Sequence, residues 1–182
     1  SCLMVGPLAL VPREFSAARP PPSRDRSPDG EWGTGEGTRV SPMGTVLLLD
    51  GNSLTYRAFF ALPTDMATAS GQVTNAVFGF TSMLINLLRD HRPDQVAVCF
   101  DRPEPTFRHV ANPLYKAQRE ASPDILRQQM GLVREVLTAL NVRWIELAGW
   151  EADDVIATLA TRGEAEGHDM VIVTGDRDSY QL

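Results

Sequence analysis

The sequence predicts an α/β domain whose central layer is a mainly parallel sheet. From residue 45 onward, strand-like apolar runs alternate with amphipathic helical patterns, which is typical of parallel strands joined by right-handed crossovers. Each of the four apolar runs ends at a carboxylate residue, and the runs span 46–50, 96–101, 144–151 and 170–176. Because parallel strands end along one edge of a sheet, where ligands bind, we expect these acids to converge there.

Three amphipathic helices are expected between these strands. Apolar residues three and four positions apart predict the first helix from about 73 to 91. Ser122 is expected to cap the second helix, whose apolar side runs over 125–140. The third helix is expected over 152–166, with Gly167 just past its carboxyl end. The alternation contains no internal repeat, so we expect one domain.

The segment 1–43 differs from the rest of the chain, because it holds seven of the thirteen prolines and little periodic apolar pattern. We expect this leader to be disordered, since it cannot bury enough surface to offset the entropy of ordering. We also expect Met43 to be the natural start. Because the chain stops at Leu182, just past the fourth strand, we expect 44–182 to be the amino-terminal part of a longer domain.

Composition excludes several classes of protein. Two cysteines are too few for a disulfide framework, and no apolar stretch approaches the ~20 residues that span a bilayer. The apolar opening lacks the basic flank of a signal peptide, so we expect an intracellular protein in a reducing compartment. The formal charge is −6, with 17 basic and 23 acidic residues. Without the seven acids expected at the sheet edge the balance is 17 to 16, or +1, which does not exclude a nucleic acid partner.

Seven carboxylates are expected at this edge of the sheet. They are Asp50, Asp101, Glu151, Asp153, Asp154, Asp176 and Asp178. Their mutual repulsion would raise their pKa values unless cations neutralised them, and oxygen ligands without His or Cys favour Mg²⁺ or Mn²⁺. Paired hard cations activate water and stabilise the oxygens of a phosphodiester, so the pattern predicts phosphoryl transfer.

Each acid taken alone has another explanation. Asp50 is then better explained as a turn or capping residue. Glu151, Asp153 and Asp154 would complement the dipole of a helix. Acids at all four strand ends favour the metal site instead.

A basic and aromatic segment, residues 102–122, lies between the second strand and the second helix; we call it the arch segment. Its cations are Arg102, Arg108, Lys116 and Arg119, and its aromatic residues are Phe107 and Tyr115. Cations bind phosphates and aromatic rings stack on unpaired bases, so the segment is expected to cover the metals and hold single-stranded nucleic acid. The alternative is a mobile basic loop whose aromatic side chains pack on the core.

Six short motifs together carry a resemblance to a known family. They are DGNSLTYRAF at 50–59, FD at 100–101, TFRH at 106–109, YKAQR at 115–119, EADD at 151–154 and TGDRD at 174–178. In this order and spacing they closely resemble the 5′-nuclease (5′-3′ exonuclease) domains of the flap endonuclease family, which includes those of bacterial type I DNA polymerases. The resemblance covers about 44–182 and implies a three-layer, PIN-like (Rossmann-like) α/β fold.

The resemblance also implies roles for individual residues. Asp50, Asp101, Glu151 and Asp153 match positions near a first metal ion, and Asp154, Asp176 and Asp178 match positions near a second. Lys116 and Arg119 match catalytic positions in the arch, and Tyr56, Arg57, Arg108 and Tyr115 match DNA-contacting positions. The implied activity is Mg²⁺- or Mn²⁺-dependent cleavage of DNA at 5′ ends and 5′ flaps in replication and repair. The implied context is a monomer in the bacterial cytoplasm, with a polymerase domain in the same parent chain.

The sequence departs from this family at its carboxyl end, because it stops at Leu182. The family continues with further aspartates and a helix-hairpin-helix-like element, so the resemblance implies an incomplete second metal site. A catalytically inactive, truncated DNA-binding fragment is therefore the alternative function. A phosphohydrolase of the haloacid dehalogenase type is disfavoured, because Asn52 stands where its motif needs a second aspartate.

Overall fold

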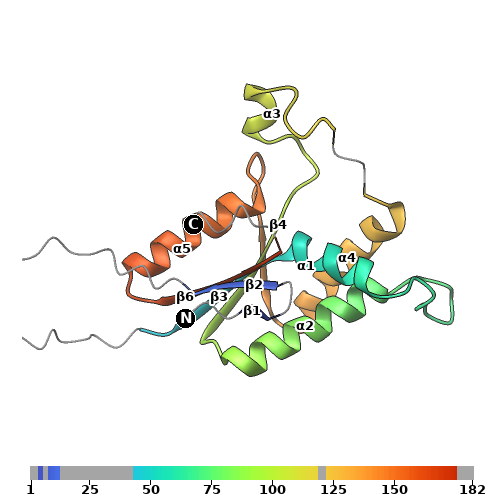
Figure 1. Cartoon of the computed structure of the whole chain (residues 1–182), viewed down its shortest axis with the longest axis horizontal. Coiled ribbons are helices and arrows are strands. Elements are labelled where there is room, and N and C mark those ends of the chain that lie inside the picture. The colour runs from blue at the N-terminus through green and yellow to red at the C-terminus, as the bar shows by residue number, and fades with distance from the viewer. Residues whose placement is uncertain (1–3, 6–7, 13–42, 119–121, 176–182) are drawn as a thin grey trace, which may run out of the picture.

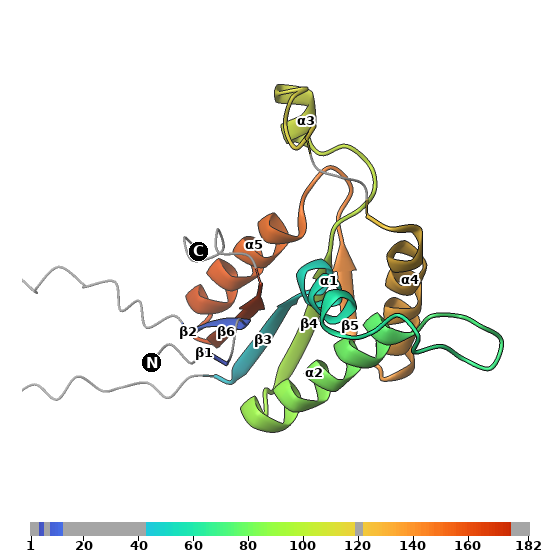
Figure 2. The same ribbon diagram turned by 45° about the vertical axis from the view of Figure 1, so that its right-hand side comes forward.

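The computed structural model describes residues 4–5, 8–12, 43–118 and 122–175, and the predicted α/β class is confirmed. Its central sheet contains four parallel strands, β3 (Thr45–Asp50), β4 (Gln95–Phe100), β5 (Arg143–Glu146) and β6 (Asp169–Thr174), in the order β6-β3-β4-β5. The strands point in one direction, toward the side on which α3 (Phe107–Ala111) lies (Figure 2). Their carboxyl ends therefore share one edge, as the sequence predicts.

Two layers of helices enclose this sheet (Figure 1). One face carries α1 (Gly51–Ala61), α2 (Asn75–His91) and α4 (Asp124–Ala139), and the other carries α5 (Ala152–Ala165). Successive side chains of β3 point to opposite faces of the sheet, so the core has two parts. Leu47 and Leu49 pack with the three helices, whereas Leu48 packs with α5. All three leucines are buried, as expected for a strand covered on both faces.

A buried polar network joins the three helices of the first layer. Gln129 of α4 accepts hydrogen bonds from the backbone N–H groups of Ala76 and Val77, at 2.8 and 3.3 Å, and donates to Asn75 at 2.9 Å. Asn75 in turn donates to the carbonyl oxygens of Phe59 and Leu62. Gln129 thereby supplies acceptors for the amides that begin α2, which have no partner within the helix.

The leader contains two short strands. β1 (Met4–Val5) pairs antiparallel with β2 (Leu8–Pro12), and β2 pairs antiparallel with β6. The prediction of a disordered leader did not anticipate these strands. The rest of that prediction concerns residues outside those the structure describes.

The sequence placed three local features differently from the structure. The third strand ends at Glu146, and a turn over 147–150 separates it from Glu151. Pro123, rather than Ser122, occupies the cap position of α4 and makes no side-chain capping bond. The first apolar residue that α4 buries is Leu126, whereas the preceding isoleucine is largely exposed. No helix in the described part of the chain is long and apolar enough to cross a membrane.

Candidate functional site

A cavity of about 470 Å³ opens at the carboxyl edge of the sheet. It is lined by Asp50, Asn52, Ser53, Tyr56, Asp101, Lys116, Glu151, Ala152, Asp153 and Gly175. Four of the predicted acids therefore share one cavity, although they come from three separate parts of the chain. The first turns of α1 and α5 both border this cavity, and the amino-terminal end of a helix favours negative charge.

Asp50 is the most deeply buried of these acids. It caps α1 by accepting a hydrogen bond from the backbone N–H of Ser53 at 2.9 Å, and its other oxygen accepts from the hydroxyl of Thr174 at 3.0 Å. Burial raises its pKa from 3.8 to about 6, and the charges of Asp153 and Asp101 add to this effect. The capping explanation for Asp50 is thus correct, and the same side chain also lines the cavity.

Asp101 connects three elements at the edge of the sheet. It follows β4, and one of its oxygens accepts a hydrogen bond from the backbone N–H of Ala152 at 2.7 Å. Its other oxygen accepts from the side-chain amide of Asn52 at 3.0 Å, and Asn52 accepts from the backbone N–H of Asp101 at 3.3 Å. The ends of β4, α1 and α5 are thereby fixed relative to one another.

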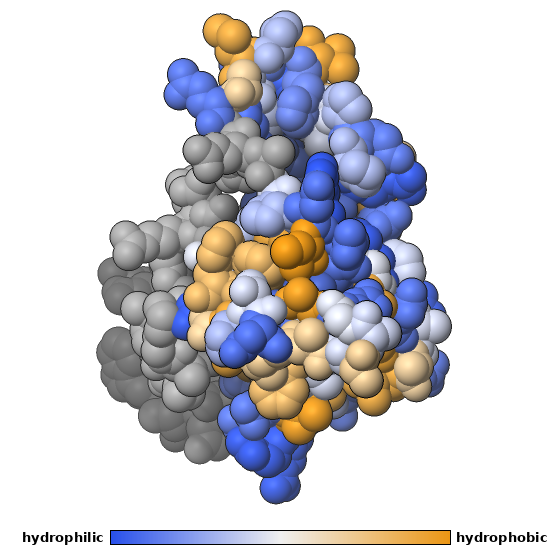
Figure 3. All heavy atoms as spheres, turned by 90° about the vertical axis from the view of Figure 1, so that its right-hand side faces the viewer, coloured by the Kyte–Doolittle hydropathy of each residue, from blue (hydrophilic) through white to orange (hydrophobic). Residues whose placement is uncertain are grey.

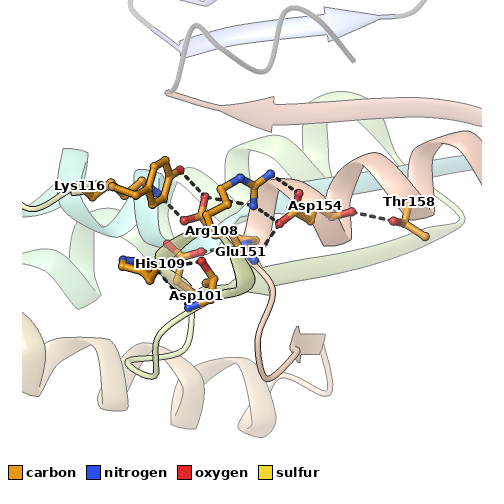
Figure 4. A network of polar contacts seen from close by, with 10 residues as sticks. Asp101, Arg108, His109, Lys116, Glu151, Asp154 and Thr158 are labelled. Atoms are coloured by element: carbon orange, nitrogen blue, oxygen red, sulfur yellow. Dashed lines mark hydrogen bonds and ion pairs between the residues drawn. The ribbon is translucent and has the colours of Figure 1, made fainter. Parts of the chain in front are cut away.

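Glu151 accepts hydrogen bonds from two side chains of the arch segment, Tyr115 and Lys116, for which the sequence predicts functional roles. Lys116 Nζ lies 2.9 Å from Glu151 Oε1, and the hydroxyl of Tyr115 donates to Glu151 Oε2 at 3.1 Å. Figure 4 shows Lys116 and Arg108 pointing toward this carboxylate from the arch segment. The segment is thus placed over the acids, as the sequence predicts.

Asp154 lies outside the lining of the cavity and makes a bidentate ion pair with Arg108, at 2.6 and 2.7 Å. The hydrogen bonds with Arg108 are the main reason that the pKa of Asp154 is lowered and that of Arg108 is raised. Asp154 also accepts a hydrogen bond from the backbone N–H of Glu151 at 3.0 Å, at the start of α5. In this arrangement both of its oxygens already have partners.

Of the remaining predicted site residues, three lie in the described part of the chain and three lie outside it. Tyr56 and Asp153 line the cavity, whereas Arg57 is half-buried on α1 and is not part of the lining. The predictions for Arg119, Asp176 and Asp178 lie outside the described residues.

The oxygen atoms that line the cavity are suitable ligands for a hard divalent cation. The lining offers carboxylate, amide and hydroxyl oxygens and contains no His or Cys. Burial is the main cause of the raised pKa of Asp50, and the neighbouring charges of Asp153 and Asp101, which a bound cation would offset, add to it. Over the residues that the structure describes, however, no three Asp, Glu, His or Cys side chains already stand in a ligating group. Binding would therefore require acids such as Glu151 to exchange their present partners.

The sequence comparisons agree with this geometry. A family model described as "5′-3′ exonuclease, N-terminal resolvase-like domain" matches residues 45–182, which is most of the chain. The chain belongs to this family of 5′-3′ exonuclease N-terminal domains.

Relatives of this exonuclease domain include several DNA polymerases I. The chain is 52% identical to the DNA polymerase I of Mycobacterium bovis over 139 residues, which cover 76% of this chain and 15% of that protein. It is 45% identical to the thermostable DNA polymerase I of Thermus thermophilus over 141 residues, covering 78% of this chain and 17% of the relative. The chain therefore spans about a sixth of the length of these relatives.

Two solved structures from bacteriophage T5 are also similar. One, described as the T5 D15 protein co-crystallised with metal ions, has a TM-score of 0.47 and 21% identity, covering 64% of this chain and 44% of that one. The other is a D15 flap endonuclease variant in complex with DNA and metal ions, with a TM-score of 0.48 and 19% identity, covering 69% and 47%.

The sequence did not identify the residues that support the acids of this exonuclease domain. Asn52 and Thr174 hold Asp101 and Asp50, and the hydroxyl of Ser53 accepts from the backbone N–H of Gly175 at 2.8 Å. An aspartate three residues before Ser53 is typical of a helix cap and indicates the bond from the Ser53 backbone N–H, but it does not indicate the contact of its hydroxyl with Gly175. No comparable local pattern indicates Thr174, whose partner lies 124 positions away.

Proposed function

We propose that this chain carries the metal-binding catalytic site of a 5′-3′ exonuclease and 5′-flap endonuclease that acts on DNA in bacterial replication and repair. The supporting observation is that four acids from separate segments line one cavity into which Lys116 of the arch segment also extends. Net charge alone does not suggest a nucleic acid partner, so the proposal rests on this arrangement and on the family.

In this proposal Asp50, Asp101, Glu151 and Asp153 hold Mg²⁺ or Mn²⁺ in the cavity. A divalent cation bound there supplies an activated water and stabilises the attacking and leaving oxygens of a phosphodiester. Asp176 and Asp178 complete a second site from the segment after β6.

The arch segment and α1 contact the DNA in this proposal. Lys116 and Arg119 neutralise charge that develops on the scissile phosphate. Tyr56 and Tyr115 offer aromatic faces to unpaired bases, and Arg57 contacts the phosphate backbone. Lys116 reaches the phosphate by leaving Glu151, whose carboxylate then becomes available to the cation.

Because Arg108 and Asp154 form an ion pair, we propose a role for each that differs from the role predicted from the sequence. Asp154 was predicted as a ligand near the second metal, and Arg108 as a DNA contact. Because they neutralise each other through two short hydrogen bonds, we propose that Asp154 holds the arch segment through Arg108 in the metal-free protein.

The parent protein is proposed to be a DNA polymerase I, with a polymerase domain in the same polypeptide. The identities of 52% and 45% to two such polymerases support this proposal. The substrate would then be duplex DNA with a 5′ end or a 5′ single-stranded flap, and the enzyme would act as a monomer in the cytoplasm.

A second candidate is a DNA-binding fragment without catalytic activity. It is favoured by the observation that, within the described residues, no three potential ligands stand in a ligating group. Cleavage and binding must therefore be measured separately.

The test uses the full-length gene product and a 5′-flap duplex labelled at its 5′ end, with Mg²⁺ or with a chelator. We expect Mg²⁺-dependent release of the flap by the wild-type protein and none by Asp50→Asn or Asp153→Asn, which should still bind the duplex. Asp169→Asn is the matched control, because this exposed acid lies at the opposite end of β6. Flap binding without cleavage by the wild-type protein would favour the second candidate, and near-normal turnover by both site variants would refute the metal site.

A further inference from the structure

The contacts described for the arch segment converge on one stretch of the domain, residues 146–154. Arg102 pairs with Glu146 at 3.5 Å, and the backbone N–H of Phe107 donates to the carbonyl oxygen of Gly149 at 3.1 Å. Arg108, Tyr115 and Lys116 all contact acids at the start of α5. The turn between β5 and α5 is therefore the platform on which the arch segment rests.

An aromatic pair lies at the centre of this platform. The rings of Phe107 and Trp150 are 5.0 Å apart between centroids, and the guanidinium carbon of Arg108 lies 4.6 Å from the centroid of Phe107. The two rings are tilted by 55°, and Trp150, Phe107 and Arg108 thus form a continuous series of contacts that leads to the ion pair with Asp154. Gly149 has a φ of 82°, a backbone conformation that brings its carbonyl oxygen to Phe107 without a steric penalty.

Farther along the arch segment the rings of His109 and Tyr115 lie 5.3 Å apart between centroids, but the outermost apolar side chains are exposed. Val110 and Leu114 are 82% and 80% exposed, and Figure 3 shows apolar side chains at the outer end of this segment. Lys116 itself has a φ of 57°, which a residue with a side chain adopts only when its surroundings impose it. The position of Lys116 over the cavity therefore depends on the contacts of Lys116 and Tyr115 with Glu151 and on the contacts at the base of the segment.

We infer that Trp150 is a positioning residue, which holds the base of the arch segment through Phe107 so that Lys116 meets Glu151 at the cavity. Trp150 is 47% exposed, and its ring contacts the arch segment. This role adds a positioning residue to the proposed nuclease function. Only its expected effect on cleavage rests on that function. The effect on the arch segment itself is independent of any activity.

A purely structural role for Trp150 makes a different prediction. Trp150 also lines a cavity of about 320 Å³ with Leu147, Val155 and Leu159. If Trp150 served only to fill this cavity, truncating Leu147 in the same turn would loosen the arch segment as much as truncating Trp150. The pair of variants Trp150→Ala and Leu147→Ala therefore separates the two roles.

The first experiment measures hydrogen exchange of the arch amides over 108–116 in the 182-residue chain without metal or DNA. We expect exchange to be about three- to tenfold faster in Trp150→Ala, since an aromatic pair contributes to local stability on this scale. Trp150→Phe should restore slow exchange, and Leu147→Ala should resemble the wild type. Unchanged exchange in Trp150→Ala, or equal acceleration in Leu147→Ala, would overturn the inference.

The second experiment measures single-turnover cleavage of the 5′-flap duplex by the full-length gene product. Trp150→Ala should lower the rate from bound substrate about tenfold with little change in the Kd for DNA, and Trp150→Phe should recover it. A lower affinity with an unchanged rate would overturn the positioning role. If the wild-type protein does not cleave, the proposed function fails, whereas the exchange experiment still decides whether Trp150 positions the arch segment.

Discussion

Replacement of Asp50 by asparagine should stabilise the metal-free protein at neutral pH while abolishing its proposed activity. Asp50 is 6% exposed and faces the charges of Asp153 and Asp101. Asparagine has nearly the same shape, can accept the hydrogen bond from the Ser53 amide, and can donate to the Thr174 hydroxyl. The substitution therefore removes a buried charge and retains most of the local hydrogen bonding.

The size of this effect can be worked out from the pKa of Asp50. Its pKa is about 6 in the folded chain and 3.8 as an ordinary aspartate, so the folded state binds the proton more tightly than the unfolded state. Stability from this group is fully present below about pH 4 and is lost as the pH rises through 6. At 1.36 kcal/mol per pH unit, the loss amounts to at most about 3 kcal/mol at neutral pH.

Urea unfolding in a chelating buffer at pH 4 and at pH 7.5 measures the prediction. We expect Asp50→Asn to exceed the wild type in free energy of unfolding by about 1 to 3 kcal/mol at pH 7.5 and by little at pH 4. Asp169→Asn, an exposed acid at the other end of the sheet, should show no such pH-dependent difference. The reasoning is refuted if Asp50→Asn differs from the wild type by the same amount at both pH values.

Two further predictions concern buried groups other than the acids of the cavity. Gln129→Met should lower the free energy of unfolding by about 2 to 4 kcal/mol in urea, because it leaves the amides that begin α2 and the side chain of Asn75 without partners. Gln128→Met, at the exposed neighbouring position, should change it by less than about 0.5 kcal/mol, and equal losses would contradict the role of the network. Cys99 should stay unreactive toward a thiol reagent at pH 8 in a folded Cys2→Ser variant, because burial, and then the charge of Asp50, raises its pKa to about 12. Rapid labelling without denaturant would show that its environment is wrong.

The central features of the fold were predictable because they depend on local patterns. β3 ends at Asp50 and Asp101 directly follows β4, and the period of the apolar residues distinguishes strands from helices before any contact is known. The convergence of Asp50 and Asp101 is then a consequence of parallel topology alone. The interleaved cations and aromatic residues of the arch segment indicated its place above the acids, and its Lys116 does lie over them.

The features that the sequence could not predict depend on pairs far apart in the chain. Arg108 and Asp154 are 46 positions apart, and both matched functional motifs, so nothing local indicated that they would neutralise each other. Gln129 occupies a core position of an amphipathic helix, and its partners come from the start of another helix. In both cases tertiary contacts, rather than propensity or pattern, decide the outcome.

The most direct test of the account is whether the acids of the cavity hold a divalent ion in the 182-residue chain. Mn²⁺ can be titrated into the protein and its free fraction followed by electron paramagnetic resonance, with Mg²⁺ as competitor. The account predicts binding that Mg²⁺ displaces, about tenfold or more weaker in Asp153→Asn and unchanged in Asp169→Asn. Equal Mn²⁺ affinity in the wild type and Asp153→Asn, or no binding by the wild type, would contradict it.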